Sequence, residues 1–147
     1  MSRAMSSSRL RPLQRIAELR EDEAAKRLLD QRRVLGEREL RLQELTRYLA
    51  EYEGLASAQH PRLLMNRQAF IERLREAVAL QAQLVEQARS QVEAQRAEWL
   101  LQHREVATLD RLADCYRRRE RRIEEQRSQR QLDEFALARF VAADTPP

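Results

Sequence analysis

Residues that interrupt helices or cross-link chains are scarce in this sequence. The 147 residues include two glycines, four prolines and one cysteine, and only 5% are aromatic. A single cysteine excludes a disulfide within the chain. The sequence has no run of about 18 apolar residues that could span a membrane, and its first eight residues lack the apolar segment of a signal peptide. These absences favour long, uninterrupted helices.

Charged residues, in contrast, are abundant. They make up 35% of the chain, and the net charge is +4. Arginine, glutamate, leucine, glutamine and alanine dominate, which is typical of long helices and coiled coils and argues against a compact globule. Nearly all the positive charge comes from arginine, with Lys26 as the one lysine. Because acidic and basic residues are interleaved, we interpret the surface as a solvated helix surface rather than a nucleic-acid interface.

One segment near the middle of the chain interrupts the helical pattern. Residues 53–62 contain Gly54, Ser57 and Pro61. Glycine tolerates positive φ, and proline lacks an N–H and clashes with the preceding turn, so such a cluster ends helices and makes turns. This segment predicts the tip of a hairpin.

The predicted fold is all-α, a single domain over residues 1–147. It consists of two long helices in an antiparallel coiled-coil hairpin with a C-terminal helical overhang. Pro12 suits a first helical turn, and Asn66 is a good N-cap because its side chain can accept from a free N–H. We therefore expect helices over about residues 10–56 and 66–142, a turn over about 57–65, and disorder at 1–9 and 143–147.

A heptad repeat runs through both predicted helices. An apolar repeat of 3.5 residues marks a coiled-coil seam, in which positions a and d face the partner helix. In the first helix position a holds Leu28, Leu35, Leu42 and Leu49. In the second helix it holds Ile71, Val78, Val85, Val92, Trp99, Val106 and Ala113. The repeat predicts that these two stripes pack against each other.

The repeats also predict how the two helices are aligned. In an antiparallel pair each a layer faces a d layer, so the numbers of facing residues have a constant sum. A turn centred on Pro61 gives the sum 123, which places Leu35 opposite Ala88 and Ala24 opposite Trp99. Large residues then face small ones, as a packed seam requires. Registers one heptad away, with the tip near residue 58 or 65, remain open.

The second helix is expected to extend beyond the first. The register places the start of the first helix, near residue 10, opposite residue 113, so about 28 residues extend further, or roughly 40 Å at 1.5 Å per residue. This overhang holds the arginine-rich segment 117–122 and the apolar residues Leu132, Phe135, Leu137 and Phe140. Apolar residues that nothing in the chain covers indicate a partner, although a frayed tail is the alternative.

Near the predicted tip, one flank of the seam is apolar and the other is mostly polar. The g positions there are Tyr48, Leu55, Phe70, Ala77 and Leu84, and the e positions are Thr46, Glu53, Arg75, Ala82 and Arg89. A seam needs no such asymmetry, and exposed tyrosine and phenylalanine are typical anchors for another protein. The g flank is therefore a candidate partner site, the alternative being that it shields the seam.

No catalytic or cofactor site is indicated. The sequence has no glycine-rich loop that would hold a phosphate. His60 and His103 are isolated from each other and from Cys115, so no metal set is visible and no cofactor is predicted. A pair of helices offers no concave pocket in which catalytic groups could be arranged. We expect that the protein is not an enzyme.

Three short segments stand out in order along the chain. They are Tyr48-Leu49-Ala50-Glu51-Tyr52, then Asn66-Arg67-Gln68-Ala69-Phe70-Ile71-Glu72-Arg73-Leu74, then Leu132-Asp133-Glu134-Phe135-Ala136 followed by Arg139. With the Arg/Glu/Leu-rich first helix and the heptads around Trp99, they make nearly the whole chain resemble the FliJ family, the coiled-coil component of the bacterial flagellar type III protein-export apparatus.

The resemblance implies a role in flagellum biogenesis, and so in motility and chemotaxis. FliJ proteins resemble the central stalk of rotary ATPases. The end with both termini enters the ring of the export ATPase FliI, which works with its regulator FliH, and the other end reaches the export gate FlhA. Family members also assist export chaperones. The implied location is the cytoplasm, peripheral at the inner-membrane face of the flagellar base, with no membrane insertion and no nucleic-acid partner.

The resemblance also implies which residues bind these partners. The gate-facing stripe of the family maps onto Leu45, Tyr48, Tyr52, Phe70, Leu74 and Ala77. Arg41 and Gln81 hold two further positions of that stripe with changed residue types. At the ATPase ring we expect arginines to steer entry and phenylalanines to pack. The residues concerned are Arg117, Arg118, Arg121, Arg122, Phe135 and Phe140.

Two other functions remain open from the sequence. The stalk protein of a virulence type III secretion system shares the hairpin, although the Leu-Asp-Glu-Phe-Ala segment favours the flagellar system. A basic coiled-coil nucleic-acid binder belongs to a different class. In such proteins the basic region precedes a parallel zipper, whereas here the arginine run follows an antiparallel hairpin and is mixed with glutamate.

Overall fold

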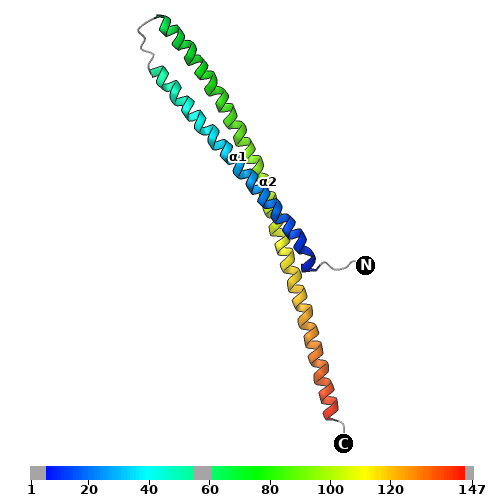
Figure 1. Ribbon diagram of the computed structural model, residues 1–147. Helices are drawn as coiled ribbons and strands as arrows, with labels where there is room; N and C mark the ends of the chain where they lie inside the picture. Colours follow the sequence, from blue (N-terminus) through cyan, green and yellow to red (C-terminus); the bar gives the residue numbers. More distant parts are fainter. Residues whose placement is uncertain (1–5, 55–60, 145–147) are drawn as a thin grey trace. The chain divides into compact units, whose positions relative to one another are not determined.

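The computed structural model describes residues 6–54 and 61–144, and almost all of them are helical. Helix α1 spans Ser7–Gly54 and helix α2 spans Pro61–Ala143. The described residues contain no strand. Figure 1 shows α1 beside α2 with the opposite chain direction. The prediction of an all-α pair of long antiparallel helices is confirmed.

Helix α1 begins earlier than the sequence indicated. Its first residue is Ser7, and in the first turn the Arg9 N–H donates to the Ser6 carbonyl at 3.0 Å. The prediction of disorder is therefore wrong for residues 7–9. Pro12 therefore lies in the second turn of α1 instead of the first. In the second turn its missing N–H leaves the Ser8 carbonyl without its helical hydrogen bond.

Helix α2 also begins earlier, at Pro61. Residues 61–65 are helical rather than part of a turn, and Asn66 is inside the helix rather than its N-cap. Two local start signals compete here. Proline suits the first helical position, because the N–H that it lacks would have no partner within the helix there. The predictions for residues 1–5, 55–60 and 145–147 fall outside the described residues.

The chain packs as two compact units. Among the described residues, 20–54 with 61–102 form one, called the hairpin unit below, and 6–19 with 103–144 form the other, called the terminal unit. In each unit a stretch of α1 packs against a stretch of α2.

The buried residues of both units occupy predicted a or d positions. In the hairpin unit they are Ala24, Leu28, Ile71, Val85 and Ala88, and in the terminal unit they are Leu10, Ala17 and Ala113. Among the described residues every buried one is apolar, and half are alanines. Small side chains at the seam let the two helices approach closely, which close packing favours. Each unit thus has a narrow core along one stripe of each helix.

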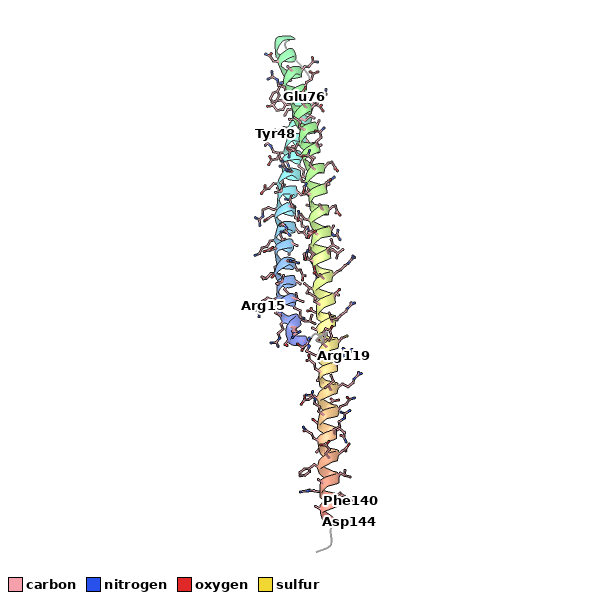
Figure 2. The ribbon with its side chains drawn as sticks, turned by 90° about the vertical axis from the view of Figure 1, so that its right-hand side faces the viewer. Arg15, Tyr48, Glu76, Arg119, Phe140 and Asp144 are labelled. Carbon is pink, nitrogen blue, oxygen red and sulfur yellow. The ribbon has the colours of Figure 1, made fainter. Side chains whose placement is uncertain are left out.

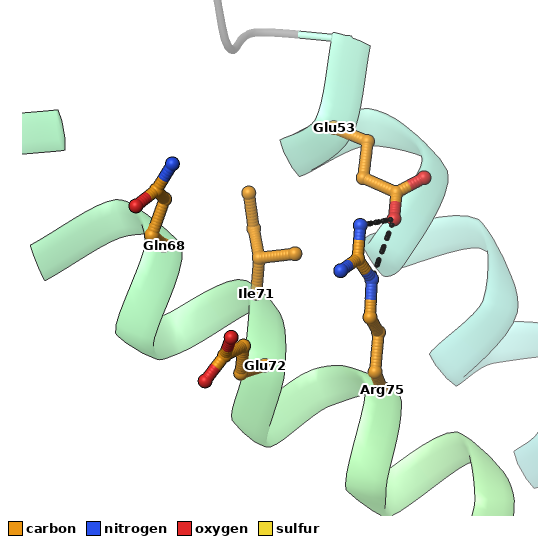
Figure 3. Close-up of a pocket in the computed structure, with 5 residues that line it drawn as sticks. All are labelled: Glu53, Gln68, Ile71, Glu72 and Arg75. Atoms are coloured by element: carbon orange, nitrogen blue, oxygen red, sulfur yellow. Dashed lines mark hydrogen bonds and ion pairs between the residues drawn. The ribbon is translucent and has the colours of Figure 1, made fainter. Parts of the chain in front are cut away.

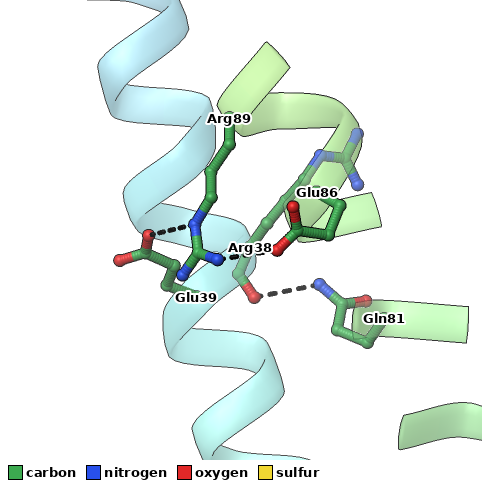
Figure 4. A network of polar contacts seen from close by, with 5 residues as sticks. All are labelled: Arg38, Glu39, Gln81, Glu86 and Arg89. Atoms are coloured by element: carbon green, nitrogen blue, oxygen red, sulfur yellow. Dashed lines mark hydrogen bonds and ion pairs between the residues drawn. The ribbon is translucent and has the colours of Figure 1, made fainter. Parts of the chain in front are cut away.

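Three polar contacts establish the register of the hairpin unit. The Gln81 side chain donates to the Arg38 carbonyl at 3.1 Å, a contact between two d positions (Figure 4). Two ion pairs join e positions: Arg75 donates from Nε and Nη2 to one Glu53 oxygen at 3.1 and 2.9 Å, and Arg89 lies 3.9 Å from Glu39 (Figures 3 and 4).

These contacts distinguish the three candidate registers. The d–d pair has residue numbers that sum to 119, and both e–e pairs sum to 128. A layer sum of 123 allows both values. In the register one heptad lower, Gln81 could still reach Arg38, but the two e–e ion pairs could not form. In the register one heptad higher, the two ion pairs could form, but Gln81 could not reach Arg38. The predicted register is therefore confirmed in the hairpin unit.

In the terminal unit a carboxylate from α2 caps the start of α1. The Ser7 N–H donates to Glu120 Oε1 at 2.8 Å, and the Ser7 hydroxyl donates to Glu120 Oε2 at 2.7 Å. The Gln14 side chain donates to Asp110 at 2.9 Å further along. A negative charge is favourable at a helix N-terminus, because free N–H groups and the helix dipole point at it.

The Ser7 backbone N–H, and after it the Ser7 hydroxyl, hold the pKa of Glu120 below its usual value; desolvation opposes this shift, and Arg117 adds to it. Because the pKa is lower in the folded protein, the contact stabilises the start of α1 at pH values above the usual pKa of a glutamate. That contribution is lost as the pH falls through the lowered pKa.

The overhang is shorter than the sequence indicated. Since α1 reaches Glu120, the part of α2 beyond it begins at residue 121 instead of near residue 114. Residues 121–143 rise roughly 35 Å along the helix axis at 1.5 Å per residue. All described residues from 117 to 144 are exposed. Figure 2 labels Phe140 near the end of this single helix and Asp144 directly after it.

We predict that Glu120→Ala frays the first turns of α1. At neutral pH the amide protons of residues 7–14 should exchange with solvent faster in the variant, because α1 loses its cap. As the pH falls through the Glu120 pKa, wild type should approach the variant. Amide hydrogen exchange across a pH series measures both effects.

The matched control is Glu124→Ala, one turn further along α2. Glu124 makes no hydrogen bond or ion pair among the described residues, so this change should leave the exchange of residues 7–14 unaltered. Equal fraying in both variants, or in neither, would contradict the cap.

Candidate partner-binding surfaces

The first candidate surface, called the aromatic flank below, lies in the hairpin unit. It consists of the predicted gate-facing residues Leu45, Tyr48, Tyr52, Phe70, Leu74 and Ala77. The rings of Tyr52 and Phe70 make an edge-to-face contact between α1 and α2, with centroids 4.8 Å apart and an interplanar angle of 68°. Tyr48 and Phe70 are nevertheless 51% and 42% exposed, and Figure 2 shows where Tyr48 lies on α1. The structure thus brings aromatic residues of both helices to one flank.

The members of the aromatic flank divide by exposure. Leu45, Tyr52, Leu74 and Ala77 are half-buried, and the first three occupy d positions. They contribute to packing at the seam as well as to the surface. Tyr48 and Phe70 occupy g positions and are the two exposed members of the flank. A partner protein would find its anchors in these two side chains.

The opposite flank of the hairpin unit is polar. It carries the Glu53–Arg75 and Glu39–Arg89 ion pairs. A groove at the first pair is lined by Glu53, Gln68, Ile71, Glu72 and Arg75, so two carboxylates and a guanidinium surround one apolar side chain (Figure 3). The asymmetry that the sequence indicated is present in the structure.

The second candidate surface, called the tail surface below, lies in the terminal unit. It consists of Arg117, Arg118, Arg121, Arg122, Phe135 and Phe140. Its arginines lie on two faces of α2. Arg117 and Arg121 line a groove with Glu120 and Glu124, and Arg117 also bonds Asp114 at 2.5 Å. This face is therefore a mixture of positive and negative charge.

The other arginine face carries positive charge alone. Arg118 and Arg122 line a groove with Arg119, Cys115, Ile123 and Gln126. None of these three arginines makes an ion pair among the described residues. Sequence analysis left Arg119 out of the site, although the run of arginines from 117 to 119 contains it. The three guanidinium groups are available to a negatively charged partner.

The phenylalanines of the tail surface are among the most exposed apolar residues. Phe135 is 62% and Phe140 69% exposed. The Arg139 guanidinium lies over the Phe135 ring, 5.3 Å from its centroid, a cation–π contact between side chains four residues apart. Leu132, Leu137 and Val141 are also well exposed on the same segment. An apolar segment this exposed is typical of an interaction site.

Comparison with known proteins shows which family the chain belongs to. A family model described as Flagellar FliJ protein matches residues 5–144. The chain belongs to the flagellar FliJ family. Searches of curated proteins and of solved structures find no match. Family membership makes the protein a component of the flagellar protein-export apparatus and confirms the resemblance found in the sequence.

In this FliJ-family chain the matched region includes both candidate surfaces. The part of the chain that the structure describes contains no group of three or more His, Cys, Asp or Glu residues that could hold a metal ion. Nor is any helix within 6–54 and 61–144 long and apolar enough to cross a membrane. The candidate sites are exposed side-chain surfaces on α1 and α2.

Proposed function

We propose that this protein links the export ATPase to the export gate, like the central stalk of a rotary ATPase. The observation that carries the proposal is that each unit exposes an apolar surface, and that the charged residues near the surface differ between the two units. The aromatic flank in the hairpin unit lies opposite a flank of ion pairs, and the tail surface in the terminal unit combines unpaired arginines with phenylalanines. Two surfaces of different chemistry suit two different partners.

The proposed partner of the aromatic flank is the export gate protein FlhA. Tyr48 and Phe70 are large, exposed and held on helices, so a partner can bury them without ordering a flexible loop. The half-buried Leu45, Tyr52, Leu74 and Ala77 would form the rest of the contact. The identity of this partner rests on the family resemblance. The choice of Tyr48 and Phe70 as anchors rests on their exposure.

The proposed partner of the tail surface is the ring of the export ATPase FliI. A single helix with exposed apolar residues fits a ring lumen, which surrounds it on all sides. Unpaired arginines would raise the rate of encounter with an acidic lumen. FliH and the export chaperones are further proposed partners, on the family resemblance alone. The proposed location is the cytoplasm, at the inner-membrane face of the flagellar base.

We predict that the double variant Tyr48→Ala/Phe70→Ala weakens binding to FlhA by a hundredfold or more. Each aromatic anchor at the centre of an interface contributes about 2 kcal/mol or more. Thermal unfolding should change little, because both side chains lie outside the a and d positions and only the edge-to-face contact of Phe70 with Tyr52 is lost between the helices. Stimulation of FliI should persist. Calorimetric titration of the gate domain and circular-dichroism melting measure the two effects.

The control for this experiment is Val85→Ala in the seam. Val85 is 2% exposed, so losing its two methyl groups should lower the melting temperature while leaving gate affinity nearly unchanged. A Tyr48/Phe70 variant that unfolds early yet binds the gate normally would make the flank part of the core and remove the site assignment.

For the tail surface, we predict that Phe135→Ala/Phe140→Ala abolishes stimulation of the FliI ATPase without changing the melting temperature. Both side chains are more than half exposed, so their removal costs the fold little. ATPase rate as a function of stalk concentration is the measurement. The control is Leu80→Ala, an equally exposed apolar residue of the hairpin unit (62% exposed), which should stimulate like wild type. Undiminished stimulation by the double variant would refute the ring assignment.

A further inference from the structure

The outer face of α2 carries opposite charge in the two units. This face comprises the heptad positions b, c and f, which point away from α1. Over residues 66–102 of the hairpin unit, its charged residues are Glu72, Arg73, Glu76, Glu86 and Glu93, all exposed. Four acids against one base make this part of the face acidic, whereas the chain as a whole has a net charge of +4.

In the terminal unit the same face is basic. Between residues 103 and 122 its charged residues are Arg104, Arg111, Asp114, Arg118, Arg121 and Arg122, all exposed. The one acid among them, Asp114, already bonds Arg117 on the same helix. The side chains of the five arginines have no ion pair among the described residues. Arg121 also lines the groove with Glu120 and Glu124. The other four arginines of the row carry one sign of charge on a helix surface where charges are otherwise interleaved.

The two rows match in spacing as well as in charge. In the acidic row, Glu93, Glu86 and Glu76 are separated by seven and ten residues. In the basic row, Arg104, Arg111 and Arg121 are separated by the same seven and ten residues in the opposite direction. Two antiparallel helices would therefore place Glu93 beside Arg104, Glu86 beside Arg111 and Glu76 beside Arg121.

We propose that the acidic outer face of one copy docks on the basic outer face of a second copy, with the two α2 helices antiparallel. A second copy is the partner that uses both rows. A nucleic acid, an anionic membrane or an acidic protein would use only the basic row and leave the acidic row without a function. In a two-fold dimer each contact occurs twice, once from each chain.

Apolar residues next to the acidic row add area to this contact. Leu101 is 60% exposed and Leu100 is 38% exposed; both follow Glu93 on the outer face of the hairpin unit, with Ala97 between them and Glu93. Glu76 and Glu93 make no ion pair among the described residues, whereas Glu86 bonds Arg89 at 2.7 Å (Figure 4). Glu86 would thus share its carboxylate between Arg89 and the second copy.

The contact consists largely of exposed ion pairs, each of which contributes little. The dimer should therefore be weak and should dissociate as salt is added. Arg118, Arg121 and Arg122 also belong to the tail surface, so one copy cannot use them for both purposes at once. The self-association itself does not depend on the proposed partners, because it involves this chain alone.

The test is a charge exchange in the full-length protein, followed by sedimentation equilibrium at low and high salt. Wild type should show a concentration-dependent dimer at low salt only. The variant Arg104→Glu/Arg111→Glu and the variant Glu86→Arg/Glu93→Arg should each weaken self-association by about tenfold or more, because like charges then oppose each other. Mixing the two variants should restore dimers, since every acidic row then meets a basic row on the other chain.

Arg33→Glu/Arg47→Glu supplies the control, with the same charge change at exposed positions of α1; it should dimerise like wild type. Circular dichroism establishes that each variant is folded. The proposal is overturned if wild type is monomeric at every concentration at low salt, if the control loses the dimer equally, or if the mixture fails to recover it. Salt-sensitive binding of duplex DNA or anionic vesicles through Arg104 and Arg111, without self-association, would also overturn it and assign the basic row to that ligand.

Discussion

The structure depends on one constraint: apolar residues at heptad positions a and d must be buried between two helices that run in opposite directions. Every buried residue among those described occupies one of these positions, and Ala24, Ala88 and Ala113 let the helices approach closely. A core this narrow leaves most side chains in contact with water. Most apolar side chains outside a and d are therefore exposed, and their distribution is what gives the protein surfaces that other proteins can bind.

The same constraint explains why the candidate surfaces lie where they do. In the hairpin unit the g flank is next to the seam but not required by it, so Tyr48 and Phe70 can be aromatic and exposed without loss of packing. In the terminal unit α1 begins at Ser7, and the part of α2 beyond Glu120 has no second helix to cover Phe135 and Phe140. Residues in the seam therefore hold the two helices together, and exposed residues outside it are available to bind other proteins.

The sequence predicts the seam well, because a heptad repeat is a local pattern. It leaves three registers open, and the contacts of Gln81 with Arg38, Arg75 with Glu53 and Arg89 with Glu39 decide among them. It predicts the helix ends poorly. The start of α1 depends on Glu120, which is 113 residues away from Ser7 in the sequence, and no local signal announces such a contact. For the start of α2 the sequence offers two local signals, Pro61 and Asn66, and the helix begins at Pro61. The contacts within the tail surface are equally hard to predict. Arg117 pairs with Asp114, and Arg139 lies over Phe135. The spacing of these residues along the helix allows both contacts, but the side-chain conformations decide whether they form.

The most direct test of the account is the register of the seam in solution. In a Cys115→Ser background, Leu35 and Ala88 should form a disulfide within one chain when both are replaced by cysteine, because the geometry of the bond requires Cα atoms within about 7 Å. Pairing the cysteine at Leu35 with one at Gln81 or Gln95 tests the registers one heptad away. Rapid intramolecular oxidation of the first pair alone, read by mass spectrometry under dilute conditions, is the result that the account predicts. Preferential oxidation of either other pair, or cross-linking only between chains, would contradict it.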